Sequence, residues 1–315
     1  MSEVVKMATR DAYGKALVEL GNKYNDFLVL DADLAAATKT GVFKKEFPER
    51  FYDCGIAEQN MISVAAGIAA TGKKVFASSF AMFAAGRAFE QVRNSVAYPA
   101  LNVKICATHA GISVGEDGAT HQCCEDLALM RSIPNMTVLN PADATEAKLA
   151  LFAAYELDGP VYIRFGRLAV PVIFGDDYKF EIGKGVTLKD GNDVTIIASG
   201  LLVNEALEAY ETLKEQGINA RIINMPTIKP IDEEIIVKAA KETGAIVTAE
   251  EHSVIGGLGE AVASVVTEKC PVPVFKVGVN DTFGKSGPAA ELLEKFGLSD
   301  GNIVEKVKAI LKLKK

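Results

Sequence analysis

The chain has 315 residues, of which 49% are hydrophobic, and its 41 acidic and 34 basic residues give a net charge of -7. This length accommodates about two domains, and an acidic chain without a basic stripe disfavours nucleic acid and membranes as partners. No apolar run is long enough to span a membrane and the start Met1-Ser2-Glu3 does not resemble a signal peptide, so we expect a cytoplasmic protein. The five cysteines lack metal-ligand spacing, which predicts free thiols.

The first half of the chain alternates between helical and strand-like segments. Residues 9–23 have the periodicity of a helix, with Leu17 and Leu20 on one face. Short apolar runs typical of buried strands follow at residues 27–30, 75–78, 103–107, 137–140 and 161–164. This alternation predicts a parallel sheet covered by helices on both faces.

A second alternating series follows a break in the pattern. Residues 169–192 are rich in Gly, Pro, Asp and Lys, which is typical of a linker. Strands are predicted at residues 195–198, 220–223, 245–249 and 272–277, and helices at 203–216, 232–242, 257–268 and 303–315. We therefore expect an α/β protein of two doubly wound domains, at residues 1–168 and 193–315.

The segment from residue 52 to residue 60 places a carboxylate at the start of an apolar helix. Gly55 breaks the extended residues before it, and residues 61–70 continue as a helix of small, mostly apolar residues that we expect to be buried. Glu58 would then begin a helix inside the protein. Because a carboxylate in a first turn can simply complement the helix dipole, a functional role for Glu58 depends on its neighbours.

Several other side chains follow the predicted strands directly. Ligands of doubly wound sheets bind beyond the carboxyl ends of the strands. The candidates share that position, each at or just after the end of a different strand: Asp33, Phe80, His109 and Arg164. His109 also shares a glycine-rich loop with His121. Four loops that converge on one sheet edge indicate a ligand site there.

Three motifs stand out at this edge. They are Gly-Ile-Ala-Glu-Gln at residues 55–59, Phe-x-x-Phe at residues 80–83, and His-x7-Asp-Gly-x-Thr-His-Gln at residues 109–122. In order and spacing they resemble the pyrimidine-binding domain of transketolases and of the related 1-deoxyxylulose-5-phosphate synthase, which is more specific than one short pattern. The resemblance covers residues 1 to about 165, and residues 250–253 and 278–287 resemble the third domain of transketolases more loosely.

The resemblance implies a thiamin-diphosphate-binding (pyrimidine module) fold followed by a transketolase C-terminal-like domain, with thiamine diphosphate as the cofactor. It gives Glu58 the catalytic role of holding the pyrimidine ring protonated, so that the cofactor's own amino group can act as the base. Phe80 would stack on the ring, Phe83 would line it, and Asp33 and His121 would also contact the cofactor. Without the resemblance, two rings near a turn are more often core, and a lone histidine is more often structural.

The same resemblance implies a sugar phosphate substrate and the residues that bind it. Arg10 and Arg164 match positions that clamp the terminal phosphate, for which the planar guanidinium is well shaped, although each could instead form a surface ion pair. His109 would reach the phosphate and, like His121, suits proton transfer, while Asp117 would reach a hydroxyl. One residue departs from the family pattern, because Ala37 stands where a serine usually contacts the phosphate.

One part of the family's cofactor site is missing from the sequence. Transketolases hold the diphosphate through Mg2+ with a Gly-Asp-Gly stretch and a following Asn, and this pair does not occur here. We therefore expect no metal site in this chain and a separate N-terminal transketolase subunit as partner, which carries the diphosphate and Mg2+ in an α2β2 heterotetramer. The chain is predicted to be the C-terminal subunit of a split transketolase of pentose phosphate metabolism.

Three alternatives remain open from the sequence. They are a subunit like 1-deoxyxylulose-5-phosphate synthase, a β-type subunit of a 2-oxo-acid dehydrogenase, and a non-catalytic regulatory subunit. The double-histidine loop with Asp117 favours sugar chemistry over the dehydrogenase, and a silent subunit would need neither Glu58 nor both histidines. The sequence does not identify the donor and acceptor sugars.

Overall fold

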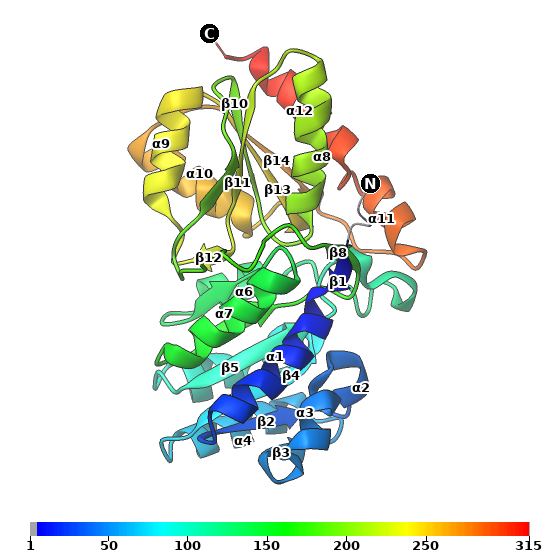
Figure 1. The fold of residues 1–315 in the computed structure, drawn as a ribbon, viewed down its shortest axis with the longest axis vertical. Helices are drawn as coiled ribbons and strands as arrows, with labels where there is room; N and C mark the ends of the chain where they lie inside the picture. The colour runs from blue at the N-terminus through cyan, green and yellow to red at the C-terminus, as the bar shows by residue number, and fades with distance from the viewer. Residues whose placement is uncertain (1–4, 315) are drawn as a thin grey trace.

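The computed structural model describes residues 5–314, which form two α/β domains stacked along the longest axis of the molecule (Figure 1). The first half of the chain builds one domain around a seven-stranded sheet, and the second half builds the other around a five-stranded sheet. No helix in the described part of the chain is long and apolar enough to cross a membrane. The predicted α/β class with two doubly wound domains is confirmed.

The sheet of the first domain has the strand order β12-β6-β7-β5-β4-β2-β3 and is parallel except for β12. Its strands are β2 (Phe27–Asp31), β3 (Phe51–Asp53), β4 (Lys74–Phe80), β5 (Val103–Thr108), β6 (Thr137–Leu139), β7 (Val161–Arg164) and β12 (Thr227–Lys229). The central strands are buried on both faces, as expected of a parallel sheet between helices. The carboxyl ends of β2, β4 and β5 therefore lie side by side.

Helices cover both faces of this sheet. One face carries α1 (Thr9–Lys23), α3 (Thr40–Glu46) and α7 (Ala144–Glu156), with α1 packed against the other two. The other face carries α4 (Glu58–Ala69), α6 (Asp126–Ser132) and a distorted segment with two π-helical turns, η2 (Met82–Arg87) and η3 (Val92–Ala97), separated by α5 (Phe89–Gln91). The short elements α2 (Ala35–Thr38), η1 (Pro48–Arg50) and η4 (Ile112–Asp117) lie in the loops. Because π-helical turns are frequent at functional sites, η2 draws attention to the loop after β4.

The helix after Glu58 is buried on one face, whereas the sequence led us to expect a fully buried helix. Met61, Ile62 and Ala65 pack into the core, but Val64 and Gly67 on the opposite face are exposed. The small apolar residues that suggested burial thus also form the exposed face of α4.

The second domain has the strand order β14-β13-β10-β11-β9, parallel except for β9. Its strands are β9 (Val186–Lys189), β10 (Val194–Ala198), β11 (Ala220–Asn224), β13 (Ile246–Ser253) and β14 (Val274–Val279). Its helices are α8 (Leu202–Glu215), α9 (Glu233–Thr243), α10 (Leu258–Lys269), α11 (Ala289–Lys295) and α12 (Asp300–Leu311). The predicted elements of this half are all present, with shifted ends.

The segment predicted as a linker contributes strands to both halves. Its first part, β8 (Ala169–Pro171), pairs with β1 (Lys6–Ala8), and its last part, β9, pairs with β11. The strand β12 then returns from the second half of the chain to the edge of the first sheet beside β6. Glu146 of α7 joins these parts, because its carboxylate accepts hydrogen bonds from Tyr178 of the linker (2.6 Å) and Asn224 of β11 (2.7 Å). These hydrogen bonds connect the two domains, and we call the contact of Glu146 with Tyr178 and Asn224 the seam.

Candidate active site

The loops at the carboxyl ends of β2, β4 and β5 bring most of the predicted site residues to one edge of the first sheet. Two of these residues have left-handed backbones, which side chains other than glycine rarely adopt: Asp33 with φ 62° and His109 with φ 57°. Asp33 is held there by a hydrogen bond from its backbone N–H to the Asp53 carboxylate (3.0 Å). Such strained residues concentrate at functional sites.

Glu58 is a buried carboxylate that faces side chains instead of its own helix. It is 1% exposed, and among the described residues its hydrogen-bond partners are Arg87 (2.7 Å) and Ser79 (3.4 Å). The residue before it, Ala57, is the N-cap of α4, and this cap uses no side-chain hydrogen bond within the described chain. Helix capping therefore does not account for the position of Glu58, and Arg87, on η2, is its counter-charge.

Two aromatic rings and two histidines form a group that Arg87 joins to this carboxylate. Phe80 and Phe83 are parallel, with ring centroids 6.0 Å apart and planes inclined by 15°. The His109 ring stacks on Phe80 at 3.8 Å, and His121 approaches both phenylalanines edge-on. Arg87 connects this group to Glu58, because its guanidinium lies 4.4 Å from the centre of the Phe83 ring.

His109 is held neutral by its surroundings. Its Nε2 atom lies 2.7 Å from the guanidinium of Arg10, which can only donate, so Nε2 must accept. The proton of the neutral ring is then on Nδ1, which donates to Thr108 (2.8 Å). Burial, followed by the positive charges of Arg10 and Arg167, lowers the pKa of His109 to about 3. His109 can therefore take up a proton only when an anion offsets these cations.

A cluster of positive charge surrounds His109. Arg10 also donates to the carbonyl of Ala37 (3.2 Å), so the residue that departs from the family pattern lies in this corner of the site. Arg167 lies close enough to lower the pKa of both Arg10, where burial is the larger cause, and His109. Lys39, which pairs with Asp11, adds a third cation. These groups can bind an anion with more than one charge.

Arg164 does not belong to this cluster. Its side chain is 4% exposed and donates to Asp126 (2.8 Å) and to the carbonyl of Glu251 (2.8 Å). Burial would lower the pKa of Arg164, but the Asp126 and Glu251 carboxylates raise it above its ordinary value. Because its charge is already neutralised inside the protein, these surroundings do not suit the phosphate clamp predicted for Arg164. The sequence analysis overlooked Arg167, three residues further on, and Arg87.

The loop between the two histidines carries Asp117. It runs through η4, and Asp117 is exposed at its end. Arg167 holds this loop by donating to the carbonyl of Val114 and to Glu116 (3.1 Å). The structure thus brings together, at the carboxyl edge of the first sheet, the predicted residues Arg10, Asp33, Glu58, Phe80, Phe83, His109, Asp117 and His121. Arg164, the last residue of β7, is instead bonded to Asp126 and to the backbone of Glu251.

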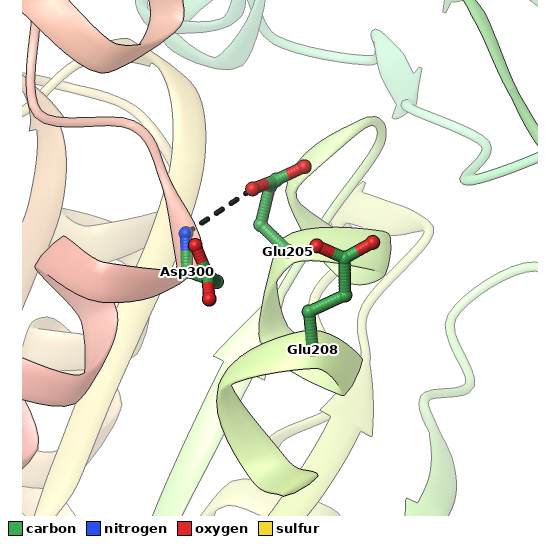
Figure 2. A group of neighbouring side chains, drawn as sticks. All are labelled: Glu205, Glu208 and Asp300. Atoms are coloured by element: carbon green, nitrogen blue, oxygen red, sulfur yellow. Dashed lines mark hydrogen bonds between the residues drawn. The ribbon is translucent and has the colours of Figure 1, made fainter. Parts of the chain in front are cut away.

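An acidic group lies elsewhere, on the second domain. Among the described residues, Glu205, Glu208 and Asp300 are the three neighbouring carboxylates close enough to one another to share an ion (Figure 2). Glu205 accepts a hydrogen bond from the backbone N–H of Asp300 (3.1 Å), so it serves the first turn of α12. A structural role explains this group.

Comparison with known proteins shows the family. Residues 5–172 match the transketolase pyrimidine-binding domain, and residues 183–303 match the transketolase C-terminal domain. The chain belongs to the transketolase family. The motifs around Glu58, Phe80 and His109 that suggested this family all lie in the first of these two matches.

Three relatives illustrate which part of a transketolase the chain resembles. It is 56% identical over 301 residues to a putative transketolase C-terminal section from Methanocaldococcus jannaschii, covering 95% of this chain and 94% of that protein. It is 47% identical to the 6-deoxy-6-sulfo-D-fructose transketolase subunit SqwH of a Clostridium species, covering 94% and 92%. A solved structure described as a split gene transketolase, inactive beta4 tetramer, superposes with a TM-score of 0.92 at 58% identity, covering 98% of this chain and 100% of that chain.

Proposed function

We propose that this chain is the C-terminal subunit of a split transketolase, which transfers a two-carbon ketol unit between sugar phosphates with thiamine diphosphate. The observation that carries the proposal is the buried Glu58 carboxylate, which Arg87 links to the parallel rings of Phe80 and Phe83. An aminopyrimidine requires a carboxylate that bonds to its ring nitrogen and flat apolar rings that pack against it. The family relationship supports the same assignment.

The residues of this chain fit the pyrimidine end of the cofactor. When bound, thiamine diphosphate would supply a nucleophilic thiazolium carbon for ketol transfer. Glu58 would hold a proton between its carboxylate and a ring nitrogen, and burial in an apolar helix start strengthens such a bond. His121 lies at the edges of both rings, where it can exchange protons with the reacting groups.

Arg87 has a part in cofactor binding under this proposal. Its guanidinium occupies one oxygen of Glu58, while 46% of its side chain remains exposed. Any donor that approaches that oxygen competes with Arg87. We infer that Arg87 pairs with Glu58 until the cofactor arrives, and that its exposed guanidinium then turns away toward solvent.

The cation cluster would bind the terminal anion of the sugar. Arg10, Arg167 and His109 meet at one point of the sheet edge, and the Nε2 atom of His109 can take a proton as the anion arrives. We therefore give the second clamp position to Arg167 instead of Arg164. A phosphate and a sulfonate satisfy the same cations, so relatives such as the sulfofructose enzyme subunit leave both kinds of sugar as substrates.

The partner would be a separate N-terminal subunit that supplies the diphosphate and Mg2+ site, in an α2β2 assembly. Exposed apolar side chains lie next to Glu58 in the sequence and on the outer face of α4, including Tyr52, Ile56 and Val64, which are 52%, 77% and 38% exposed. Exposed apolar surface of this kind is typical of a protein interface. A subunit bound there would close the cofactor site.

Reconstitution tests the proposal. The chain is mixed with the N-terminal subunit from the same organism, thiamine diphosphate and Mg2+, and ketol transfer from xylulose 5-phosphate and from 6-deoxy-6-sulfo-D-fructose is measured. We expect transfer from at least one donor in the mixture and none from either subunit alone. A mixture that forms a stable complex but transfers from neither donor would contradict the proposed activity.

A further inference from the structure

The loop that carries Asp117 rests on the C-terminal domain. Glu251, near the end of β13, accepts a hydrogen bond from the backbone N–H of Ser113 in η4 (2.6 Å). Ser113 and Glu251 are 2% and 3% exposed, so water does not replace this bond. A buried backbone N–H must be paired, and here its partner comes from the other domain.

The backbone of the loop is shaped for this contact. Gly111 has φ 81°, a left-handed conformation, and a Cβ atom at this position would overlap the Glu251 carboxylate. Glycine is therefore required twice at Gly111, by its backbone angle and by the close approach of Glu251. The missing side chain at Gly111 thus makes room for the carboxylate that binds Ser113.

A second contact holds the same loop at its other end. The side-chain amide of Gln122 donates to the carbonyls of Ile112 (3.1 Å), Gly115 (3.2 Å) and Lys285 (2.9 Å). Lys285 belongs to the glycine-rich segment after β14, so Gln122 links the loop to the C-terminal domain. The loop is thus bonded on both flanks to the domain behind it.

The contact leads directly to the cation cluster. Val114, the residue after Ser113, accepts a hydrogen bond from Arg167 through its carbonyl. The position of Ser113 therefore sets the position of the Arg167 guanidinium, which acts on His109 and Arg10. A shift of the loop would move one of the three cations away from the other two.

We propose that Glu251 is a positioning residue for substrate binding: it fixes the loop of residues 111–118 through the Ser113 N–H and so places Arg167 for the terminal anion of the sugar. The inference rests on the proposed function for its substrate. It gives the C-terminal domain a task in the active site without contact to the reacting atoms.

The chain provides a matched control in the neighbouring residue. Glu250 lies on the same strand, is buried, and accepts backbone hydrogen bonds from Leu258 (2.6 Å) and Gly259 (2.8 Å). Burial raises the pKa of both Glu250 and Glu251. Glu250 bonds within its own domain, at the start of α10, so it reports the cost of losing such a carboxylate without touching the loop.

The experiment compares Glu251→Leu and Glu251→Gln with Glu250→Leu and Glu250→Gln. Backbone hydrogen exchange of residues 110–118 is measured in the full chain, and KM and kcat are measured in the complex with the N-terminal subunit. For Glu251→Leu we expect exchange of the loop to rise by about 10-fold or more, and KM for the phosphorylated ketose to rise by about 10-fold with a smaller change in kcat. Glu251→Gln, which keeps an accepting oxygen, should restore most of both.

The control variants separate positioning from general destabilisation. Glu250→Leu should lower the melting temperature to a similar degree while faster exchange stays near residues 257–260 and KM stays unchanged. If the leucine variants do not fold, Glu251→Asp and Glu250→Asp, which pull the carboxylate back by one methylene, give the same comparison. Wild-type exchange and KM in folded Glu251→Leu or Glu251→Asp, or equal KM changes in the Glu251 and Glu250 series, would overturn the proposal. The exchange measurement needs no turnover, so it is read independently of whether the complex transfers ketol units.

Discussion

The carboxyl ends of the two sheets carry buried polar residues of similar kinds but use them differently. At the first sheet, Glu58 pairs with the half-exposed Arg87. His109 has a left-handed backbone and lies next to positively charged side chains. At the second sheet, Glu250 and Glu251 accept backbone N–H groups, and His252 lies between the backbone N–H of Ala128 and the carbonyl of Ser253. Both edges are where ligands of doubly wound folds bind.

The difference teaches which of the two edges is a site. Polar groups that are saturated by fixed backbone partners add stability and cannot bind anything else. Groups that lack fixed partners, or that pair with half-exposed side chains such as Arg87, retain the capacity to bind a ligand. We therefore propose that the first edge is the active site and that the second edge stabilises it.

The largest effect that tests this comparison is expected for Glu58. Glu58→Gln keeps the shape but removes the charge, and ketol transfer by the reconstituted complex should fall by about 10²-fold or more, the scale of lost acid–base assistance. The melting temperature should change little, because Arg87 is partly exposed and returns to water. Glu250→Gln is the control and should retain activity. Similar turnover by Glu58→Gln and wild type would contradict the assignment.

Arg164 should behave as a residue that stabilises the fold and does not bind substrate. Arg164→Ala leaves the Asp126 carboxylate buried without its partner, which costs about 3 to 5 kcal/mol of folding free energy for buried ion pairs. Urea unfolding of the chain alone measures this loss. A stable Arg164→Ala protein with an impaired KM would return the clamp role to Arg164.

Arg167 should behave as part of the site. Its side chain is partly exposed, and removing one charge-assisted hydrogen bond to the substrate should cost about 1.5 to 3 kcal/mol in kcat/KM for a phosphorylated ketose. Hydroxypyruvate, a donor without phosphate, should be affected much less. Combining Arg167→Ala with Arg10→Ala should give a non-additive loss if both bind one anion. Equal losses with both donors would mean that Arg167 stabilises the fold and does not bind the phosphate.

The two regions should also respond to pH in opposite directions. Burial raises the pKa of Glu146 in the seam from 4.5 to about 7, so its contribution to stability is complete below 4.5 and is lost as the pH rises through about 7. The pKa of His109 is lowered from 6.5 to about 3, so its contribution is present above 6.5 and is lost as the pH falls toward about 3.

Melting temperatures across this range test the seam. Glu146→Gln should remove part of the decline between about pH 5 and about pH 8, a shift of a few degrees, and His109→Gln should leave that decline in place. An unchanged pH profile in Glu146→Gln would show that Glu146 titrates normally.

Much of this architecture can be predicted from the sequence, because its signals are local. The strand and helix periods predicted most strands of both sheets and the helices α1, α4, α8, α9, α10 and α12. The motifs around Glu58 and His109 predicted which loops meet. The second-half strand β12 in the first sheet was not predicted, since three residues carry no period and their pairing with β6 is long-range.

Long-range contacts also explain which features of the site the sequence did not reveal. Arg164 is the last residue of the buried strand β7, and its partners Asp126 and Glu251 lie 38 and 87 residues away in the sequence. Arg167 follows the strand end, where ligands bind. The pairing of Arg87 with Glu58 and of Ser113 with Glu251 spans 29 and 138 residues, so no local pattern reveals it.

The central claim is that this chain holds one end of the cofactor and needs a partner for the other. Calorimetric titration of thiamine diphosphate with Mg2+ tests it most directly, on the chain alone, on the N-terminal subunit alone and on their complex. We predict weak or undetectable binding to the chain alone and tight, saturable binding to the complex, weakened by Glu58→Gln. Tight binding with ketol transfer by the isolated chain would contradict the account.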